Sequence, residues 1–292
     1  THMSASISKT AYLIFSILLT AIIVDFIFEK SAWCRHLCPL GGMTGLFSMS
    51  SLIEIRANRN VCNTICTTHD CFKGSEKADP CPMFLHLSFL SDNRDCKVCL
   101  NCIKNCTHLA TRLNLRIPGA EISSLKQPSL PGAIFSILLS GLLAAEIVSR
   151  ANIIQANYLF LFSTSILLAL ALSLTINYFT ALILKETVTE HLKHFGYALI
   201  PLILFGFISH YSADVFGNVK GTLMIFNAYK LNLNFTTTFQ LLTVLTGLLI
   251  TVYLINRIIL NVIPKSRQFQ IFAIQGIVPL VLSIVYITLF FA

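Results

Sequence analysis

Apolar residues in this chain gather into six long runs separated by polar segments. The length of each run is close to the roughly 20 residues that a helix needs to cross a bilayer. The runs are Ala11–Phe28, Gly132–Val148, Tyr158–Leu184, Gly196–Tyr211, Phe239–Ile263 and Phe269–Phe291. A long polar stretch separates the first run from the second. This pattern predicts a mainly α-helical, polytopic membrane protein with a polar insertion after its first span.

The composition supports the same class of protein. The 292 residues are 55% hydrophobic and 12% charged, and the mean hydropathy is +0.74. A soluble domain does not carry that balance, so most of the chain should lie in lipid. A signal peptide is the alternative for the first run. That run lacks a strongly basic flank and a small-residue cleavage site, so we expect a retained helix.

The pattern divides the chain into four segments. Residues 1–10 form a tag or N-terminal tail, since Thr1-His2-Met3 resembles a cloning scar or a truncated start. Residues 11–28 form the first transmembrane helix. Residues 29–130 form a cysteine-rich, ferredoxin-like domain, and residues 131–292 form a five-helix membrane domain.

Basic residues predict the orientation in the membrane. Of the 21 Lys and Arg residues, 12 lie in the segment around the cysteines, and only Lys9, Arg150, Lys220 and Lys230 lie on the opposite side. Loops rich in Lys and Arg stay on the cytoplasmic side. We therefore expect a cytoplasmic (inner) membrane protein whose cysteine-rich domain and Lys185–Phe195 loop face the cytoplasm. The loop from Ser212 to Thr238 and both termini should face outward.

Four cysteines in the insertion have the spacing Cys96-x2-Cys99-x2-Cys102-x3-Cys106. This spacing is typical of loops that bind a [4Fe–4S] cluster, although Thr107 replaces the usual proline. A zinc knuckle uses two separated pairs of ligands, and four thiols in one short loop cannot all form disulfides without strain. The motif therefore predicts iron–sulfur ligation in a reducing compartment.

A second group of thiols precedes this motif and ends in a Cys-Pro pair. It comprises Cys62, Cys66, Cys71 and Cys81. In two-cluster ferredoxins the fourth cysteine of each motif ligates the other cluster. That crossing would give one cluster to Cys62, Cys66, Cys71 and Cys106, and the other to Cys81, Cys96, Cys99 and Cys102. Zinc at the upstream group is the alternative, because thiolates suit both metals.

Cys34 and Cys38 remain, within the sequence WCRHLCPLGG at the end of the first run. Two thiols cannot complete a cubane, whose four irons each need a ligand. We expect them to hold half of a third cluster, shared with a second copy of the chain or with a homologous subunit. Free thiols, or exchange with Cys62 or Cys66, are the alternatives.

WCRHLCPLGG, followed by a ferredoxin motif and several membrane helices, resembles a family of membrane polyferredoxins. The family is related to the nitrous-oxide-reductase maturation regulator and to the quinol-oxidising subunit of periplasmic nitrate reductase. The resemblance covers roughly residues 20 to 120. It implies cytoplasmic [4Fe–4S] clusters that exchange electrons with quinone or with partner subunits. Members usually carry a second Cys-x3-Cys-Pro, and larger ones a flavin domain, but this sequence has neither.

Ionisable residues within predicted spans are candidates for function, because burying them in lipid costs free energy. His210 and Asp214 lie four residues apart near the outer end of the fourth span, and Glu146 ends the second. Such groups could accept protons from a quinol. An interfacial pair between Glu146 and Arg150 is the alternative. His191 and His194 lie in a predicted loop without a matching histidine pair, so haem is not indicated.

These patterns predict an electron-transfer subunit of a larger membrane oxidoreductase complex, with quinone as an expected partner. A maturation factor for another metalloenzyme is one alternative. A transporter with a structural or sensory cluster domain is another, but we find no internal repeat and no corresponding pair of Gly/Pro-broken helices. The sequence indicates no dinucleotide motif and no nucleic-acid partner. A homodimer or a hetero-complex would both suit a shared cluster.

The orientation can be tested by cysteine labelling from the outer face of the membrane. A membrane-impermeant maleimide should reach a cysteine at Asn218 and should miss one at Lys77 until detergent opens the membrane. The opposite labelling pattern would contradict the cytoplasmic placement of the cysteine-rich domain.

Overall fold

The structure is a computed structural model that describes residues 7–28, 32–125, 128–151, 157–225 and 233–290. The chain divides into two compact units, unit 1 up to Arg116 and unit 2 from Ile117. Six helices among the described residues are long and apolar enough to cross a membrane. The predicted mainly helical fold, with a cysteine-rich insertion after the first span, is therefore confirmed.

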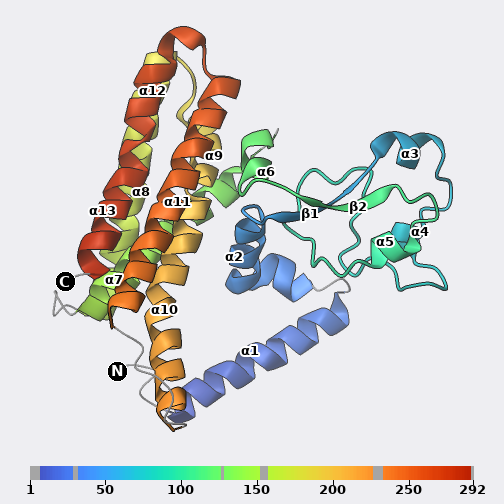
Figure 1. Cartoon of the computed structure of the whole chain (residues 1–292), viewed down its shortest axis with the longest axis horizontal. Helices are drawn as coiled ribbons and strands as arrows, with labels where there is room; N and C mark the ends of the chain where they lie inside the picture. Colours follow the sequence, from blue (N-terminus) through green and yellow to red (C-terminus); the bar gives the residue numbers. More distant parts are fainter. Residues whose placement is uncertain (1–6, 29–31, 126–127, 152–156, 226–232, 291–292) are drawn as a thin grey trace. The chain divides into compact units, whose positions relative to one another are not determined.

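Unit 1 consists of the first apolar helix and the insertion (Figure 1). Its elements are α1 (Ile7–Ile27), the π-helix η2 (Trp33–Leu37), α2 (Pro39–Ser48), β1 (Ile53–Ala57), α3 (Arg59–Thr64), α4 (Asp70–Lys73), α5 (Asn101–Asn105) and β2 (Thr111–Leu115). The most apolar 18-residue stretch of α1 is 0% buried in the structure. This exposure suits a helix whose apolar side chains face lipid.

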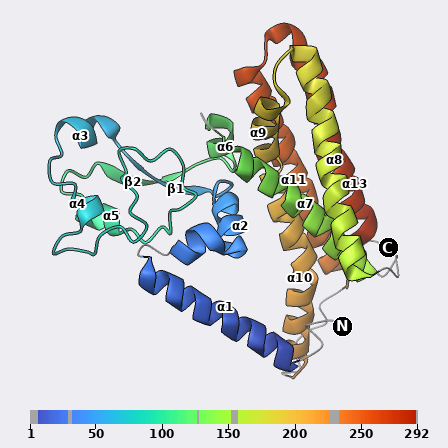
Figure 2. The same cartoon turned by 180° about the vertical axis from the view of Figure 1, so that it is seen from behind.

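Strands β1 and β2 form a two-stranded antiparallel sheet (Figure 2). Eight of the ten cysteines lie between the two strands in the sequence. Ile53 pairs with Leu115, and Ala57 pairs with Thr111. Ile55, at the centre of β1, is 1% exposed and belongs to a small core with Leu87 and Cys102. The pairing joins the two ends of the cysteine-rich loops.

Arg116, directly after β2, joins the end of α2 to this sheet. Its Nη2 donates to the carbonyl of Ser48 at 3.0 Å, and its Nε donates to the carbonyl of Ser51 at 2.9 Å. Its Nη1 lies 3.2 Å from Oε2 of Glu54. Charged groups that are half-buried and fully engaged in this way fix the backbone around them.

Unit 2 is a helical bundle with α6 (Ala120–Ser124) at its start (Figures 1 and 2). Its other elements are α7 (Leu130–Ala151), α8 (Tyr158–Leu184), α9 (Val188–Ala198), α10 (Ile200–Ile225), α11 (Leu233–Val262), the short 3-10 helix η3 (Lys265–Arg267), α12 (Gln268–Gln275) and α13 (Ile277–Phe290). Helix α7 packs against α8 and α9, and α10 packs against α11.

Two predicted loops of this unit are largely helical. Most of the predicted Lys185–Phe195 loop forms α9, and α10 continues well past Ser212 to Ile225 before α11 begins at Leu233. The hydropathy pattern did not predict these helical segments because both contain polar residues. Within a bundle, tertiary contacts extend helices beyond their apolar stretch.

Two spans are interrupted near prolines. Helix α9 ends just before Pro201, and α12 ends just before Pro279. Proline cannot donate the backbone hydrogen bond that would continue the helix. The N–H of Leu202 instead donates to Oγ1 of the fully buried Thr251 on α11, at 3.2 Å. Hydroxyl groups of neighbouring helices satisfy kinked backbones in membranes in this way.

Candidate iron–sulfur centre

Four thiols line one hollow in the insertion: Cys62, Cys66, Cys71 and Cys106, the first quartet. Cys62 lies in α3, which is capped by the side chain of Asn58 accepting from the N–H of Asn60 at 3.1 Å. Cys71 lies in α4, and Cys106 directly follows α5. Short helices on three sides therefore bring together thiols that are up to 44 positions apart in sequence (106 minus 62).

Four other thiols line a second hollow: Cys81, Cys96, Cys99 and Cys102, the second quartet. Its walls are apolar, with Ile55, Leu87 and Leu90 among them. Cys71 of the first quartet packs against the core that contains Cys102, so the two hollows are neighbours. The structure thus groups the eight thiols as the crossing scheme does, and ligation of clusters by these residues stays a prediction.

The thiols are chemically suited to bind iron. All ten cysteines are free. Burial, together with the smaller effect of neighbouring thiols, raises the pKa of Cys71 to about 11 and that of Cys102 to about 12. A buried thiol gives up its proton when a metal ion supplies the compensating positive charge. A bound cationic centre would therefore stabilise the thiolate form of these buried cysteines.

Cys106 differs from its neighbours because backbone groups point at its sulfur. Burial alone would raise its pKa, but N–H groups of Ala110, Thr111 and His108, with the Thr111 hydroxyl, bring the pKa below its ordinary value. The N–H of Ala110 donates to Sγ of Cys106 at 3.2 Å. Such N–H···S bonds favour the thiolate, which is the form that ligates iron.

Left-handed backbone conformations wind the chain around the hollows. Val98 and Leu100 have positive φ values of 52° and 66°, and they lie on either side of Cys99. Positive φ is unusual for any side chain and most unusual for a β-branched one. Each such residue costs about 1–3 kcal/mol. His69, Phe84 and Leu109 have the same conformation within three positions of other cysteines of the two quartets.

Asn105 holds the loop that carries Cys81, a role that the sequence did not reveal. The side chain is fully buried, and its Nδ2 donates to the carbonyls of Ala78 and Asp79 at 3.0 and 3.1 Å. Its Oδ1 accepts from the hydroxyl of Ser75 at 2.7 Å. Only an amide can both donate twice and accept here. A single asparagine beside a cysteine has no distinguishing signal in one sequence.

The residues fit [4Fe–4S] clusters by the chemistry of their donor sets. Among the described residues, no three Cys, His, Asp or Glu side chains are placed to hold a metal ion together. In a cubane each thiol binds a different iron, so the four ligands surround a cluster and do not converge on one ion. Four thiols around each hollow provide that arrangement.

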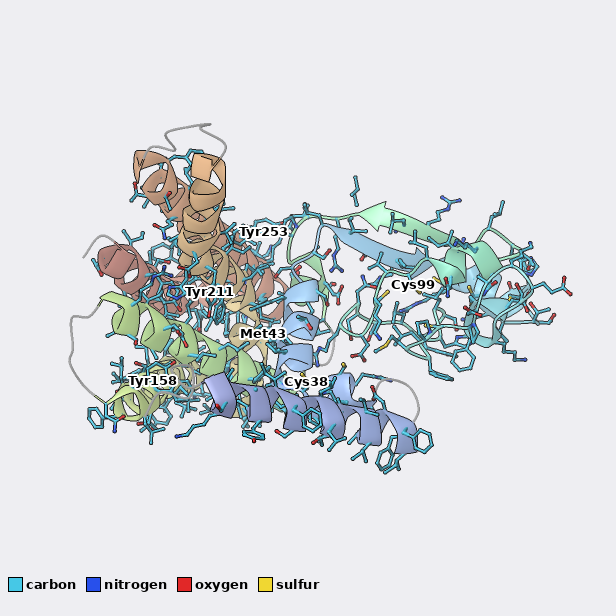
Figure 3. The ribbon with its side chains drawn as sticks, turned by 90° about the horizontal axis from the view of Figure 1, so that it is seen from below. Cys38, Met43, Cys99, Tyr158, Tyr211 and Tyr253 are labelled. Atoms are coloured by element: carbon cyan, nitrogen blue, oxygen red, sulfur yellow. The ribbon has the colours of Figure 1, made fainter. Side chains whose placement is uncertain are left out.

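Cys34 and Cys38 belong to neither quartet. Cys34 is exposed and lies in η2, while Cys38 is half-buried at the start of α2 (Figure 3). A Cβ at Gly41 would meet the carbonyl oxygen of Cys34, so only glycine lets α2 pack this closely. Cys34 and Cys96 line the same cavity, which has a volume of about 210 Å³.

The three predicted proton-accepting residues come together in unit 2. Arg150 forms an ion pair with Asp214, and its Nη1 also donates to the carbonyl of His210 at 3.3 Å. Glu146 accepts from the hydroxyl of Tyr158 at 2.7 Å. Arg150 therefore pairs with Asp214, whereas the sequence alternative paired it with Glu146. The part of these residues in quinone chemistry stays a prediction.

The two histidines of the predicted cytoplasmic loop lie on α9. His191 is buried, with its Nε2 at 3.2 Å from Oε2 of Glu186. His194 lies three positions further along the same helix. The placement of both in a loop was wrong, because α9 begins at Val188 and packs them against the bundle.

Part of this chain is similar to a known family of iron–sulfur domains. The sequence model of a 4Fe-4S binding domain family matches residues 10–56. This match covers most of α1, all of η2 and α2 and most of β1, and of the ten cysteines it includes only Cys34 and Cys38. The chain is thus a protein with six candidate membrane spans whose N-terminal region is similar to a 4Fe-4S binding domain.

Several curated proteins are similar in sequence to parts of this chain. The electron transport protein YccM of Escherichia coli is 30% identical over 44% of this chain and 33% of its own length. The ferredoxin-type protein NapH of Haemophilus influenzae is 30% identical over 34% of this chain and 36% of its own length. The methylamine utilization ferredoxin-type protein MauN of Paracoccus denitrificans is 41% identical over 16% of this chain and 17% of its own length.

The chain therefore spans about a third or less of these curated relatives. No solved structure matches it. The predicted resemblance to ferredoxin-type membrane proteins is confirmed as distant homology.

Replacing Asn105 by Ala should loosen the loop before Cys81. The three hydrogen bonds lost are buried, and each unsatisfied partner costs about 1–3 kcal/mol. Iron should then leave the protein at least several-fold faster in the presence of a chelator, as followed by absorbance. Asn114→Ala on exposed β2 is the matched control. Equal rates of iron loss from both variants would contradict a positioning role for Asn105.

Proposed function

We propose that this chain is a membrane-bound electron-transfer subunit with two [4Fe–4S] clusters, one in each thiol quartet. The single observation that carries the proposal is the grouping of eight free thiols around two neighbouring hollows. Such clusters accept and release single electrons, with potentials set by their surroundings. The electrons would pass between the quinone pool or partner subunits and the cytoplasmic side of the membrane.

Contacts among the thiols suggest the order of electron transfer. Cys34, seven positions after α1 ends, shares a cavity with Cys96 of the second quartet. Cys71 of the first quartet packs against the core that contains Cys102 of the second. The second quartet therefore lies between the membrane end of the insertion and the first quartet. Electrons would follow this sequence in either direction.

The protein's own residues prepare the sites for this chemistry. The two-stranded sheet and Asn105 hold the loops in place, so the geometry changes little when an electron arrives. The N–H of Ala110 directed at Cys106 favours its anionic form. Hydrogen bonds to the sulfurs and exclusion of water are the means by which a protein adjusts a cluster potential.

A third cluster completes this proposal at Cys34 and Cys38. The 4Fe-4S domain match includes these two thiols and none of the eight in the quartets. One chain would supply two ligands, and a second copy or a homologous subunit would supply the other two. The metal would then be part of the subunit interface.

A quinone site would involve His210, Asp214 and Glu146. Glu146 lies 16 residues after the start of α7, or about 24 Å along the helix. Protons would be accepted there, on the outer side. A charge-neutralising Glu146→Gln change should lower quinol oxidation by the purified assembly without changing its iron content. Unchanged oxidation would remove this residue from the proposal.

The first test is to count irons and to measure electron transfer in the purified assembly. Two clusters require roughly eight irons and eight sulfides per chain, with further iron only from a shared third cluster. Cys99→Ala should lower the iron content by about four. Quinol should reduce the clusters of the wild-type protein. Stoichiometric zinc would contradict the proposal, and clusters that quinol cannot reduce would favour a maturation role.

The shared cluster predicts an additional quantity of iron. A homodimer should contain roughly ten irons per chain, because each chain adds half of a shared four. Cys34→Ala with Cys38→Ala should return the count to about eight and should weaken the dimer, as measured by mass in detergent. Leu40→Ala, an exposed change on the same turn, is the control. An unchanged count in an intact complex would end this part of the proposal.

A further inference from the structure

The edge of the second quartet reaches the protein surface at Cys99. The structure describes all eight quartet thiols. Of these eight, Cys99 is exposed, Cys62 and Cys102 are buried, and the other five are half-buried. Figure 3 shows Cys99 in the loops of the insertion. An electron carrier can approach a cluster most closely where a ligand thiol is exposed. This face is therefore where the second quartet can exchange electrons with a soluble molecule.

Apolar side chains surround this thiol on the chain. Val98 is 41% exposed and Leu100 is 37% exposed. Their left-handed backbone conformations turn the chain at two of three consecutive positions. The strain of these turns is not offset by burial of the two side chains, which remain in contact with water. Contact with an apolar surface of another molecule would bury them.

Basic residues surround this apolar group. From Cys96 to Arg116 the chain has four basic residues and no Asp or Glu. Lys97 and Lys104 are exposed, and the N–H of Lys104 donates to the carbonyl of Leu100 at 3.1 Å, so Lys104 follows the apolar loop by one turn. The surface that includes Cys99 is thus apolar at its centre and positive at its rim.

A cavity continues this surface on the other side of Lys97. Besides Cys34 and Cys96 it is lined by Arg35, Arg94, Asp95 and Lys97. Its one acidic side chain, Asp95, is held by Arg35 at 3.1 Å. Three positive groups against one negative group leave the cavity with a net positive charge. This charge adds to the positive field on the Lys97 side of Cys99.

We propose that Lys97–Leu100 and Lys104 form the docking surface for a small soluble electron-carrier protein with acidic residues around its cofactor. The proposal rests on the proposed function and adds the partner. An apolar centre within a charged rim is the usual anatomy of a protein interface, and complementary charge mainly accelerates association.

One electron would pass in each encounter. The carrier is oxidised by one electron, and the cluster held by the second quartet is reduced by one, or the reverse. No bond forms or breaks, and no proton moves in the transfer. The carrier then dissociates, which a small interface with a salt-sensitive rim permits.

The test uses the complete, cluster-containing protein in detergent and a reduced acidic plant-type [2Fe–2S] ferredoxin as the probe. Stopped-flow absorbance gives the second-order rate constant for electron transfer. It should fall at least several-fold between low and high salt. Lys97→Glu with Lys104→Glu should lower it by about tenfold or more and reverse the salt dependence. Lys73→Glu with Lys77→Glu, exposed changes near the first quartet, is the matched control and should have a small effect.

A second pair of variants tests the apolar centre. Val98→Asn with Leu100→Asn keeps side chains that tolerate positive φ, and it should lower the rate constant several-fold without changing its salt dependence. Equal effects of the two lysine pairs, or a rate constant insensitive to salt, would overturn the docking surface. Loss of binding to anionic vesicles in the Lys97/Lys104 variant, with unchanged ferredoxin kinetics, would assign the surface to lipid and also overturn it.

Reduction by dithionite separates this proposal from the proposed function. If dithionite reduces the clusters in all variants while ferredoxin kinetics are unaffected, the electron-transfer proposal stands and the docking surface fails. If dithionite produces no cluster reduction in the wild-type protein, the proposed function itself fails.

Discussion

The fold of the insertion depends on the interactions that hold the eight thiols of its two quartets close together. One apolar cluster in it consists of Ile55, Leu87 and Cys102 with five half-buried neighbours, and two of those neighbours are themselves cysteines. Between β1 and β2 the loops contain only short helices and several strained residues. Segments this small rarely bury enough apolar surface to fold alone. Metal ligation supplies the missing folding free energy in such segments. The rest of the account follows from this constraint.

The proposed binding of iron would explain features of the insertion that side-chain packing alone does not explain. Thiols whose pKa values are raised by burial become favourable ligands once a cationic centre is present. Strain at Val98 and at Leu100 would persist because ligation of the neighbouring cysteines, as proposed, would determine the backbone. Arg116 fixes the backbone at the end of α2, and Asn105 fixes the loop before Cys81. The proposed cysteine ligands would hold the middle of the loops between these points.

The sequence predicted most reliably what depends on local spacing. The six apolar runs and the thiol motifs are local patterns, and the spans were confirmed in number. Helix ends and side-chain partners depend on tertiary contacts, which one sequence does not contain. Thus α9 and the extension of α10 were missed, and the alternative that paired Arg150 with Glu146 was wrong, because Arg150 pairs with Asp214. Asn105 was missed because its three partners lie 26 to 30 positions away.

The most direct test of the account is electron paramagnetic resonance of the fully reduced, purified protein. Neighbouring quartets, joined through the core of Cys102 and Cys71, should hold two reduced clusters close enough to interact magnetically. The account predicts a complex, interacting spectrum in the wild-type protein and loss of the interaction between the two quartets' clusters in Cys99→Ala. A wild-type spectrum of one isolated cluster, or no iron–sulfur signal in a protein that contains zinc, would contradict it.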